Sequence, residues 1–242
     1  MSDDKKLSVL RHIGELRHRL IVSVIAVVIT SIISFIFFEQ IFNILLVPAP
    51  QDITLIYIEM TEMIGTIMRV CLVSGIILAM PYLTYQVIMF VSPALTRKEK
   101  RYVYLILPWI ALMFAAGVTF SYFILIPPAT EFLITFGSDI ATPEIRIGNY
   151  ISIVTRLLLA IGLVFEMPVV STFLARIGVL KPKWLSDKRK VAFIFAFVLG
   201  AIITPTFDPI NQTLVAAPLI ILYELCIWLA KLVQKKETSP TT

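Results

Sequence analysis

Six apolar runs separated by polar segments dominate the pattern of this chain. They cover Leu20–Phe38, Val70–Val91, Tyr102–Ile126, Leu157–Ala175, Val191–Ile203 and Leu214–Ala230. A bilayer core about 30 Å thick needs about 20 apolar residues in one helix to cross it. Most of the runs approach or exceed that length. The pattern therefore predicts an all-α, polytopic membrane protein of six transmembrane helices in a concave bundle.

The fifth run, Val191–Ile203, has only 13 residues. A re-entrant or buried helix would also account for this length. We favour a spanning pair formed with the sixth run, because a bilayer can thin locally around short spans. The sequence TPTFDPINQ between the two runs predicts a tight corner outside the membrane.

Two loops on one side of the predicted bundle are expected to cap it. The first reads VPAPQDITLIYIEMTEMIGTIM, opens with Pro48 and Pro50, and continues with apolar residues at helical spacing. This pattern predicts a helix lying on the outer surface of the membrane. The second loop covers 127–150, begins with Pro127 and Pro128, and is interpreted as a second outer cap.

Lysine and arginine are distributed unevenly between the two sides. Of the 21 such residues, all but Arg69, Arg146 and Arg156 lie in the N-terminal segment, the 92–101 loop, the 176–190 loop or the C-terminal tail. Because positive loops stay in the cytoplasm, both termini are predicted to be cytoplasmic. The basic clusters are explained by this topology, so no nucleic-acid partner is predicted. The prediction divides the chain into a cytoplasmic amphipathic segment (1–19), a transmembrane domain (20–230) and a disordered cytoplasmic tail (231–242).

Composition narrows the functional classes. The chain is 58% hydrophobic and 15% charged, with a mean hydropathy of +0.91, whereas soluble domains are about 45–50% apolar. Cys71 and Cys226 both lie in apolar runs without a CxxC or Cys/His cluster, so we predict no disulfide, metal or other cofactor. The motifs HExxH, GxSxG and GxxxxGK[ST] are absent, which argues against an intramembrane enzyme and against ATP as the energy source.

A carboxylate interrupts the fourth run in the stretch AIGLVFEMP. Glu166 lies midway between Arg156 and Arg176, which are 20 residues apart, or about 30 Å along a helix. An ionised carboxylate at the bilayer centre costs at least about 2.5–3.5 kcal/mol on insertion scales. Three states fit this position: a neutral carboxyl group, a water-filled cavity, or a polar partner from another helix. A purely structural alternative is a neutral Glu166 that bonds a backbone carbonyl exposed by a kink at Pro168.

The sixth run also contains an acid, Glu224. It lies seven residues before Lys231 and is expected to reach the membrane interface. An ion-coupled small-solute permease is the alternative function that these two acids leave open. Such a permease would have several intramembrane ionisable residues along a path, and we find only these two and no internal repeat.

Two carboxylates interrupt the basic cytoplasmic side. Glu15, in RHIGELRHRL, has Arg11 and Arg19 four residues away on either side, and Glu99 lies among basic residues in SPALTRKEKRY. From the residues alone, ordinary ion pairing with these neighbours is the simpler interpretation.

Four motifs together resemble the TatC family, the receptor subunit of the twin-arginine protein translocase. HIGELRHRL is similar to the family's HLxELRxRL, FVSPALTRKEKR to its first inner loop, AIGLVFEMP to its AFGxxFEMP, and GAIITPTFDPINQTLVAAPLIILYE to the corner between its last two spans. The motifs cover nearly the whole chain in the family's order. Two departures are Ile13 in place of the commoner Leu and one extra residue between TP and Asp208.

This resemblance implies a function and its residues. The matching positions are Glu15, Arg17, Phe90 and Glu99 for signal-peptide binding, Glu166 for a polar partner site inside the membrane, and Pro48 and Asp208 for the function of the outer loops. The implied protein is a multi-pass receptor in the cell membrane and not an enzyme. The implied partners are twin-arginine signal peptides of folded proteins, TatA-like and TatB-like single-span proteins, and further copies of the chain within the complex. The implied energy source is the proton-motive force.

Overall fold

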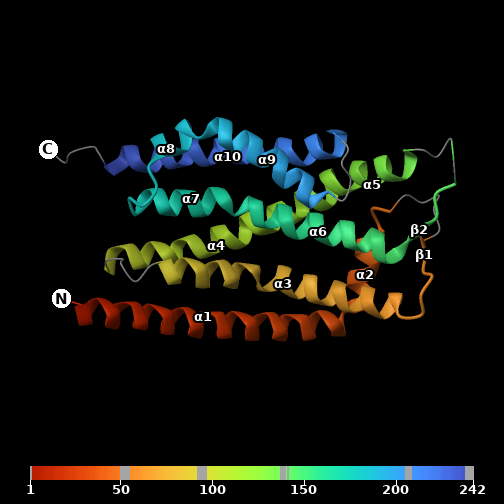
Figure 1. Ribbon diagram of the computed structural model, residues 1–242, viewed down its shortest axis with the longest axis horizontal. Coiled ribbons are helices and arrows are strands. Elements are labelled where there is room, and N and C mark those ends of the chain that lie inside the picture. The colour runs from red at the N-terminus through yellow and green to blue at the C-terminus, as the bar shows by residue number, and fades with distance from the viewer. Residues whose placement is uncertain are drawn as a thin grey trace.

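Long helices lying side by side make up nearly all of the structure (Figure 1). This computed structural model describes residues 2–49, 55–91, 97–136, 140, 142–204 and 209–237. The helices are α1 (Ser2–Ile36), α2 (Phe38–Leu46), α3 (Glu62–Val91), α4 (Arg97–Phe120), α5 (Ile126–Thr135), α6 (Ile147–Phe165), α7 (Met167–Arg176), α8 (Pro182–Asp187), α9 (Arg189–Ile203) and α10 (Pro209–Glu237). A π-helical turn, Ser121–Leu125, joins α4 to α5.

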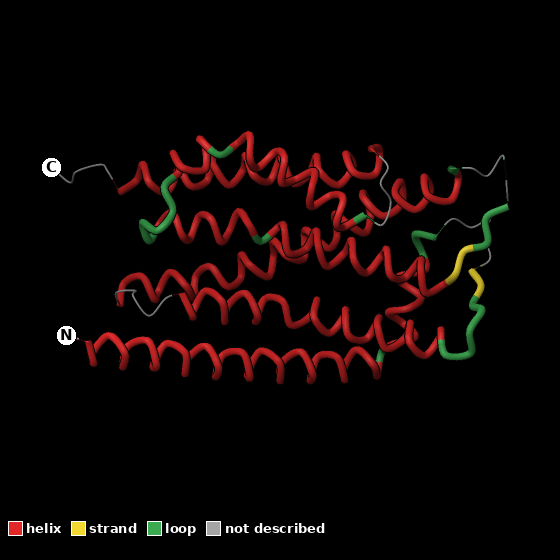
Figure 2. Tube along the Cα trace, in the orientation of Figure 1, coloured by secondary structure: helices red, strands yellow, loops and turns green. Residues whose placement is uncertain are grey.

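The two ends of the molecule differ. Helix α1 begins and α10 ends at one end, which we call the termini end (Figure 1). The opposite end, which we call the capped end, holds α2, α5 and the strands β1 (Leu55–Ile56) and β2 (Ile145–Arg146) (Figure 2). The strands form a parallel pair in which Leu55 is opposite Ile145 and Ile56 is opposite Arg146.

Within the described residues, five helical segments are long and apolar enough to cross a membrane. They are Ile13–Ile36, Glu62–Phe90, Ile106–Thr135, Ile147–Arg176 and Pro209–Gln234. The predicted class, an all-α polytopic membrane protein, is confirmed. The fifth predicted span is the 15-residue helix α9, which is about 22 Å long. It packs against α10 and runs in the opposite direction (Figure 1).

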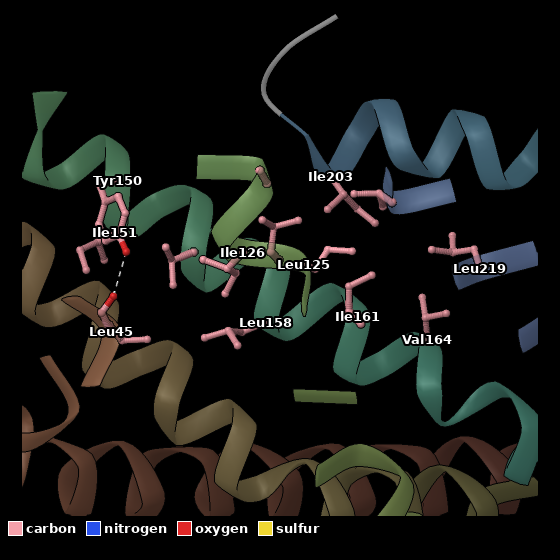
Figure 3. Close-up of a cluster of buried hydrophobic side chains, with 14 of the residues drawn as sticks. Leu45, Leu125, Ile126, Tyr150, Ile151, Leu158, Ile161, Val164, Ile203 and Leu219 are labelled. Carbon is pink, nitrogen blue, oxygen red and sulfur yellow. Dashed lines mark hydrogen bonds between the residues drawn. The ribbon is translucent and has the colours of Figure 1, made fainter. Parts of the chain in front are cut away.

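The core lies along α6. Ile151, Val154 and Ile161 on this helix are completely buried, and they face apolar side chains from the capped end and from α10 (Figure 3). Helix α2 is attached to this core by the hydroxyl of Tyr150, which donates a hydrogen bond to the carbonyl of Leu45 at 3.1 Å. Such bonds satisfy the carbonyl groups that a helix leaves unpaired at its C-terminus.

The first outer cap was predicted in the wrong place. The cap helix is α2, which ends at Leu46, before the proline-rich segment to which the prediction assigned it. In that segment, residues Leu55–Ile56 form β1, and the remaining helical periodicity belongs to the first turns of α3. The side chain of Glu62, the first residue of α3, accepts the N–H of Ile58 at 3.0 Å and links the preceding segment to the start of the helix. The second cap is α5, which has Pro127 and Pro128 in its first turn. It continues from α4 through the π-helical turn, so both helices belong to the segment Ile106–Thr135.

The predicted segment boundaries do not coincide with breaks in the helices. Helix α1 is continuous from Ser2 to Ile36, through the predicted border at residue 19. Helix α10 continues to Glu237, so seven residues of the predicted disordered tail are helical. Residues 238–242 lie outside the described part of the chain.

Helix α1 has one close approach to its neighbour α3. A Cβ atom added at Gly75 of α3 would lie 2.6 Å from the Cα atom of Ser31. The hydroxyl of Thr30 also donates a hydrogen bond to the carbonyl of Gly75 at 2.8 Å. Small residues allow helix backbones to approach in this way inside a membrane. The contact fixes the register between α1 and α3, and therefore the alignment of polar residues nearer the termini end.

Candidate functional site

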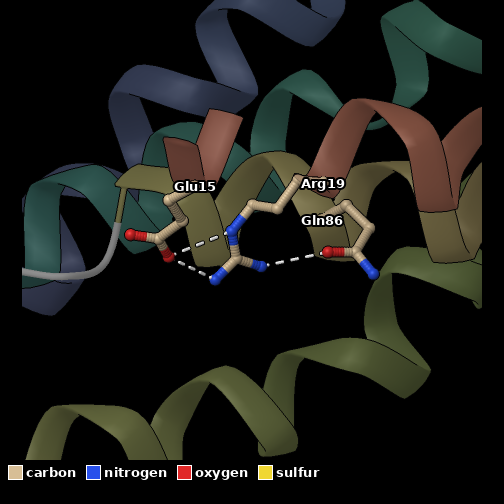
Figure 4. A network of polar contacts seen from close by, with 3 residues as sticks. All are labelled: Glu15, Arg19 and Gln86. Atoms are coloured by element: carbon tan, nitrogen blue, oxygen red, sulfur yellow. Dashed lines mark hydrogen bonds and ion pairs between the residues drawn. The ribbon is translucent and has the colours of Figure 1, made fainter. Parts of the chain in front are cut away.

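A polar cluster links α1 and α3 (Figure 4). Its residues lie in the half of each helix nearer the termini end. Arg19 donates to Oε1 of Glu15 from Nε at 3.2 Å and from Nη2 at 2.7 Å. Its Nη1 atom donates to Oε1 of Gln86 at 3.0 Å, and Gln86 in turn donates to the hydroxyl of Tyr82 at 2.6 Å. The predicted pairing of Glu15 with Arg19 at helical spacing is therefore confirmed. The side chain of Arg11, the other predicted neighbour, lies outside the described residues.

The pair of Glu15 and Arg19 remains accessible. The side chain of Glu15 is 33% exposed and that of Arg19 is 19% exposed. Ion pairs in contact with water contribute roughly 0–1 kcal/mol, because solvent competes for both charges. Another guanidinium group could therefore replace Arg19 on Glu15 at a low energetic cost.

The other residues predicted at the inner face are distributed around this cluster. Phe90 is half-buried on α3, one helical turn beyond Gln86. Arg17 is exposed on α1, but a separation of two residues places it about 200° around the helix from Glu15. The structure therefore brings Phe90, but not Arg17, toward the face that carries Glu15.

Glu99 is the third residue of α4, and its side chain lies outside the described residues. Helix α4 begins at the termini end, where α3 ends, and α3 packs against both α1 and α4 (Figure 1). The backbone of Glu99 is consequently at the same end of the bundle as the cluster around Glu15.

Glu166 occupies the break between α6 and α7. The helix is interrupted because Pro168 has no N–H and its ring conflicts with the preceding turn. The N–H of Glu166 donates to the carbonyl of Leu163 at 3.1 Å, and its own carbonyl accepts the N–H groups of Val169 at 3.1 Å and Val170 at 3.0 Å. The predicted kink at Pro168 is confirmed.

The side chain of Glu166 is only 3% exposed and finds its partner on another helix. Its Oε2 atom accepts a hydrogen bond from the hydroxyl of Thr84 on α3. Among the described residues, its Oε1 atom has no hydrogen-bond partner. Of the interpretations left open by the sequence, a polar partner from a neighbouring helix agrees with the structure, and a bond to a backbone carbonyl does not.

Glu166 and Thr84 line an apolar groove of about 500 Å³ between α3 and α7. The rest of its lining is Met80, Leu83, Val87, Leu163, Met167, Val170, Ser171, Leu174 and Leu180. A buried acceptor beside an apolar groove suits an apolar helix that carries one polar side chain, because a buried polar group is costly unless it is hydrogen-bonded.

Comparison with known proteins identifies the family. The model of the family described as Sec-independent protein translocase protein (TatC) matches residues 11–218. The chain belongs to the TatC family. The TatC protein of Carboxydothermus hydrogenoformans is 41% identical over 238 residues, which cover 98% of each chain. The TatC protein of Aquifex aeolicus is 41% identical over 231 residues, which cover 93% of this chain and 95% of the relative.

A crystal structure titled as the twin-arginine translocase receptor TatC has the same fold. It is 41% identical, has a TM-score of 0.82, and the match covers 92% of this chain and 99% of that one. Membership of the TatC family makes the chain a multi-pass membrane component of a protein translocase and not an enzyme.

The resemblance assigned two positions to the outer loops, Pro48 and Asp208. The structure describes only the first of them. Pro48 is half-buried in the turn after α2, where the N–H of Ala49 donates to the carbonyl of Leu46 at 3.0 Å. Asp208 lies in 205–208, outside the described residues. Glu224 forms an ion pair of 2.7 Å with Arg189, and both side chains are about half exposed.

The sequence did not indicate which residues of α3 take part in the sites of Glu15 and Glu166. Thr84 bonds Glu166 directly, and Gln86 bonds Arg19, the partner of Glu15. Thr84, Gln86 and Tyr82 lie within the second apolar run and were not singled out. The available signal was the cluster of polar side chains in PYLTYQV, in the half of that run nearer the termini end. Because Thr84 is 82 residues away from Glu166, helix packing and not local spacing brings the two together.

Proposed function

We propose that this TatC-family chain is a receptor that binds the paired arginines of signal peptides at its cytoplasmic rim. The observation that supports this best is that Glu15 already holds a guanidinium group, that of Arg19, with both bonds converging on one oxygen. Gln86 holds the same guanidinium from α3. Glu15 and Gln86 are thus already arranged to accept hydrogen bonds from a guanidinium group, which is the group that a twin-arginine peptide presents.

Recognition follows from an exchange of guanidinium groups. A signal-peptide arginine displaces Arg19 from Glu15, and the adjacent arginine pairs with Glu99 at the start of α4. Charge-assisted hydrogen bonds contribute about 1.5–3 kcal/mol each. Arginine presents a planar fork of donors and lysine does not, so a lysine pair fits the two carboxylates less well. Phe90 supplies an apolar edge beside this site.

The orientation in the membrane follows from charge. The basic segments are next to the termini end, and positive loops remain in the cytoplasm. Both termini and the Glu15 cluster therefore face the cytoplasm, with the capped end on the far side of the cell membrane. A signal peptide of a folded protein reaches the carboxylates without crossing the bilayer.

Glu166 acts in a later step. An apolar helix enters the groove beside α3 and α7, and a polar side chain on that helix bonds the Oε1 atom of Glu166. TatA-like or TatB-like single-span proteins provide such helices, and several copies of the chain assemble in the complex. A partner helix can shift the receptor from its idle to its loaded state only if it binds the two states with different affinities. A hydrogen bond to the buried Oε1 atom of Glu166 provides that difference. The proton-motive force drives the transport that follows.

Photo-crosslinking tests the receptor step. A photo-reactive residue placed near Glu99, in the complete complex, should crosslink to a twin-arginine signal peptide and lose the crosslink in the Glu15→Gln or Glu99→Gln variant. Glu224→Gln is the matched control, because Glu224 also pairs with an arginine at 2.7 Å but lies elsewhere on the bundle. Unchanged crosslinking in Glu15→Gln and Glu99→Gln would contradict the proposal.

A further inference from the structure

A polar groove of about 520 Å³ opens at the capped end, between the first turns of α3 and α6. Its polar lining includes Glu59, Glu62, Arg69, Arg146, Asn149 and Ser152. It is separate from the cluster around Glu15 and from the groove beside Glu166. Neither of the proposed steps uses it.

The fold builds this groove from two segments that run in the same direction. The parallel strands β1 and β2 lead into α3 and α6, so the N-terminal turns of both helices lie together (Figure 1). A Cβ atom added at Gly148 would lie 3.1 Å from Oε1 of Glu62. The glycine therefore lets α6 approach the acid closely at one wall of the groove.

Arginine is concentrated here on a side of the protein that otherwise has few cations. Arg69, Arg146 and Arg156 are the only Lys or Arg residues assigned by sequence to the non-cytoplasmic side. Two of them line the groove, and Arg156 follows Ser152 by four residues on α6, which places it on the same helix face. Among the described residues, neither Arg69 nor Arg156 forms an ion pair with a carboxylate.

The depth of two of these arginines matches that of lipid phosphates. Arg69 directly precedes the apolar run Val70–Val91, and Arg156 directly precedes Leu157–Ala175. Both side chains are exposed. Positions at the ends of apolar runs lie at the headgroup level of the bilayer. The two guanidinium groups therefore lie where the adjacent leaflet presents its phosphates.

We propose that this groove binds the headgroup of an aminophospholipid from the leaflet at the capped end. The phosphate pairs with Arg69 and Arg156, because guanidinium groups bind phosphate through parallel hydrogen bonds. The ammonium group lies near Glu59 and Glu62, on the side of the groove farther from the bilayer centre. Arg146 also lines the groove beside Glu62, but the two acids outnumber it there. The net charges at the two levels are therefore opposite, which favours a headgroup with both an ammonium and a phosphate group over one with a phosphate alone.

Native mass spectrometry of the delipidated full chain in detergent provides the first test. Phosphatidylethanolamine and phosphatidylglycerol are titrated separately against the natural protein, the double variant Arg69→Gln/Arg156→Gln, and the control Lys181→Gln/Lys183→Gln. We expect the double variant to bind phosphatidylethanolamine at least about tenfold more weakly, and the control to bind it normally. Unchanged binding in the double variant, or equal binding of the two lipids by the natural protein, would overturn the proposal.

Photo-crosslinking in membranes that contain the complete translocase identifies the occupant. A photo-reactive residue at Ser152 reports on the groove, and one at Met68, which is 57% exposed beside Arg69, reports on ordinary lipid contact at similar depth. An aminophospholipid adduct at Ser152 that Arg69→Gln/Arg156→Gln removes, with the Met68 adduct unchanged, supports the site. An adduct at Ser152 to a second copy of the chain or to another protein would instead show that the groove is a protein interface, and would overturn the proposal.

Discussion

The two central acids of this TatC-family protein have different kinds of partner. Glu15 is accessible and pairs with a cation, Arg19, whereas Glu166 is buried and accepts a hydrogen bond from a neutral hydroxyl, that of Thr84. Near water a charged partner can be exchanged at a low cost. Inside the bundle a charge without compensation is expensive, so the acid needs a hydrogen-bonding partner. The difference suits Glu15 for selecting an arginine ligand and Glu166 for sensing an apolar helix.

The largest expected effect comes from reversing the charge at the accessible acid. Glu15→Lys places an ammonium group beside Arg19 and repels the incoming guanidinium group. Affinity for a twin-arginine peptide should fall at least about 100-fold, because an attractive contact is replaced by a repulsive one. Fluorescence anisotropy with the labelled peptide measures this change. Glu224→Lys is the matched control, and an equal loss in both variants would remove the special role of Glu15.

Removing the buried acid should separate binding from transport. We expect Glu166→Ala to bind the peptide within about twofold of the natural protein but to lose about tenfold in transport, since one buried hydrogen bond to a partner helix is absent. Glu166→Gln keeps an acceptor oxygen and should be intermediate. Peptide binding and export of a folded reporter are measured on the same variants. Full transport by Glu166→Ala would contradict the assigned role.

Salt should distinguish the two sites. Raising the ionic strength from about 0.1 M to 1 M shortens the Debye length from about 10 Å to about 3 Å. Peptide affinity at the accessible carboxylates should therefore fall several-fold. Recruitment of a single-span partner to the groove beside Glu166 should change little. Binding isotherms for peptide and partner at both salt concentrations test this, and an equal response of the two would show that the sites do not differ as described.

The last effect concerns stability and not binding or transport, and it is expected at the partner of the buried acid. Thr84→Val keeps the shape of the side chain but removes the hydroxyl donor, which should cost about 1–3 kcal/mol of stability. Thermal unfolding in detergent measures the change. Thr84→Ser retains the donor and is the control. If Thr84→Val and Thr84→Ser unfold at the same temperature, the hydrogen bond to Glu166 contributes little to the fold.

The sequence pattern predicted a structural feature correctly where all of the residues that form it are close together in the sequence. The spacing of Glu15 and Arg19 predicted their ion pair, Pro168 predicted the break at Glu166, and the prolines at 127 and 128 predicted the second cap. Each depends on residues within a few positions of one another. The hydropathy of the long runs likewise predicted the polytopic class.

Local pattern failed where a feature depends on contacts between distant segments. The periodicity of 56–67 predicted a separate cap helix, but pairing of Leu55–Ile56 with Ile145–Arg146 makes part of that segment a strand. Packing of α3 against α6 brings Thr84 to Glu166. Packing of α3 against α1 brings Gln86 to Arg19, the partner of Glu15. Helix geometry places Arg17 on the far side of α1 from Glu15. The two residues therefore do not share one binding face, although the resemblance implies signal-peptide binding for both.

A double-mutant cycle between the receptor and the peptide tests the central claim most directly. Peptide affinity is measured for the natural protein, Glu15→Gln and Glu99→Gln, each with the natural twin-arginine peptide and with peptides in which the first or the second arginine is replaced by lysine. The account predicts a coupling energy of about 1 kcal/mol or more between each carboxylate and one of the two arginines, with a different arginine for each. Coupling energies near zero for both carboxylates would contradict it.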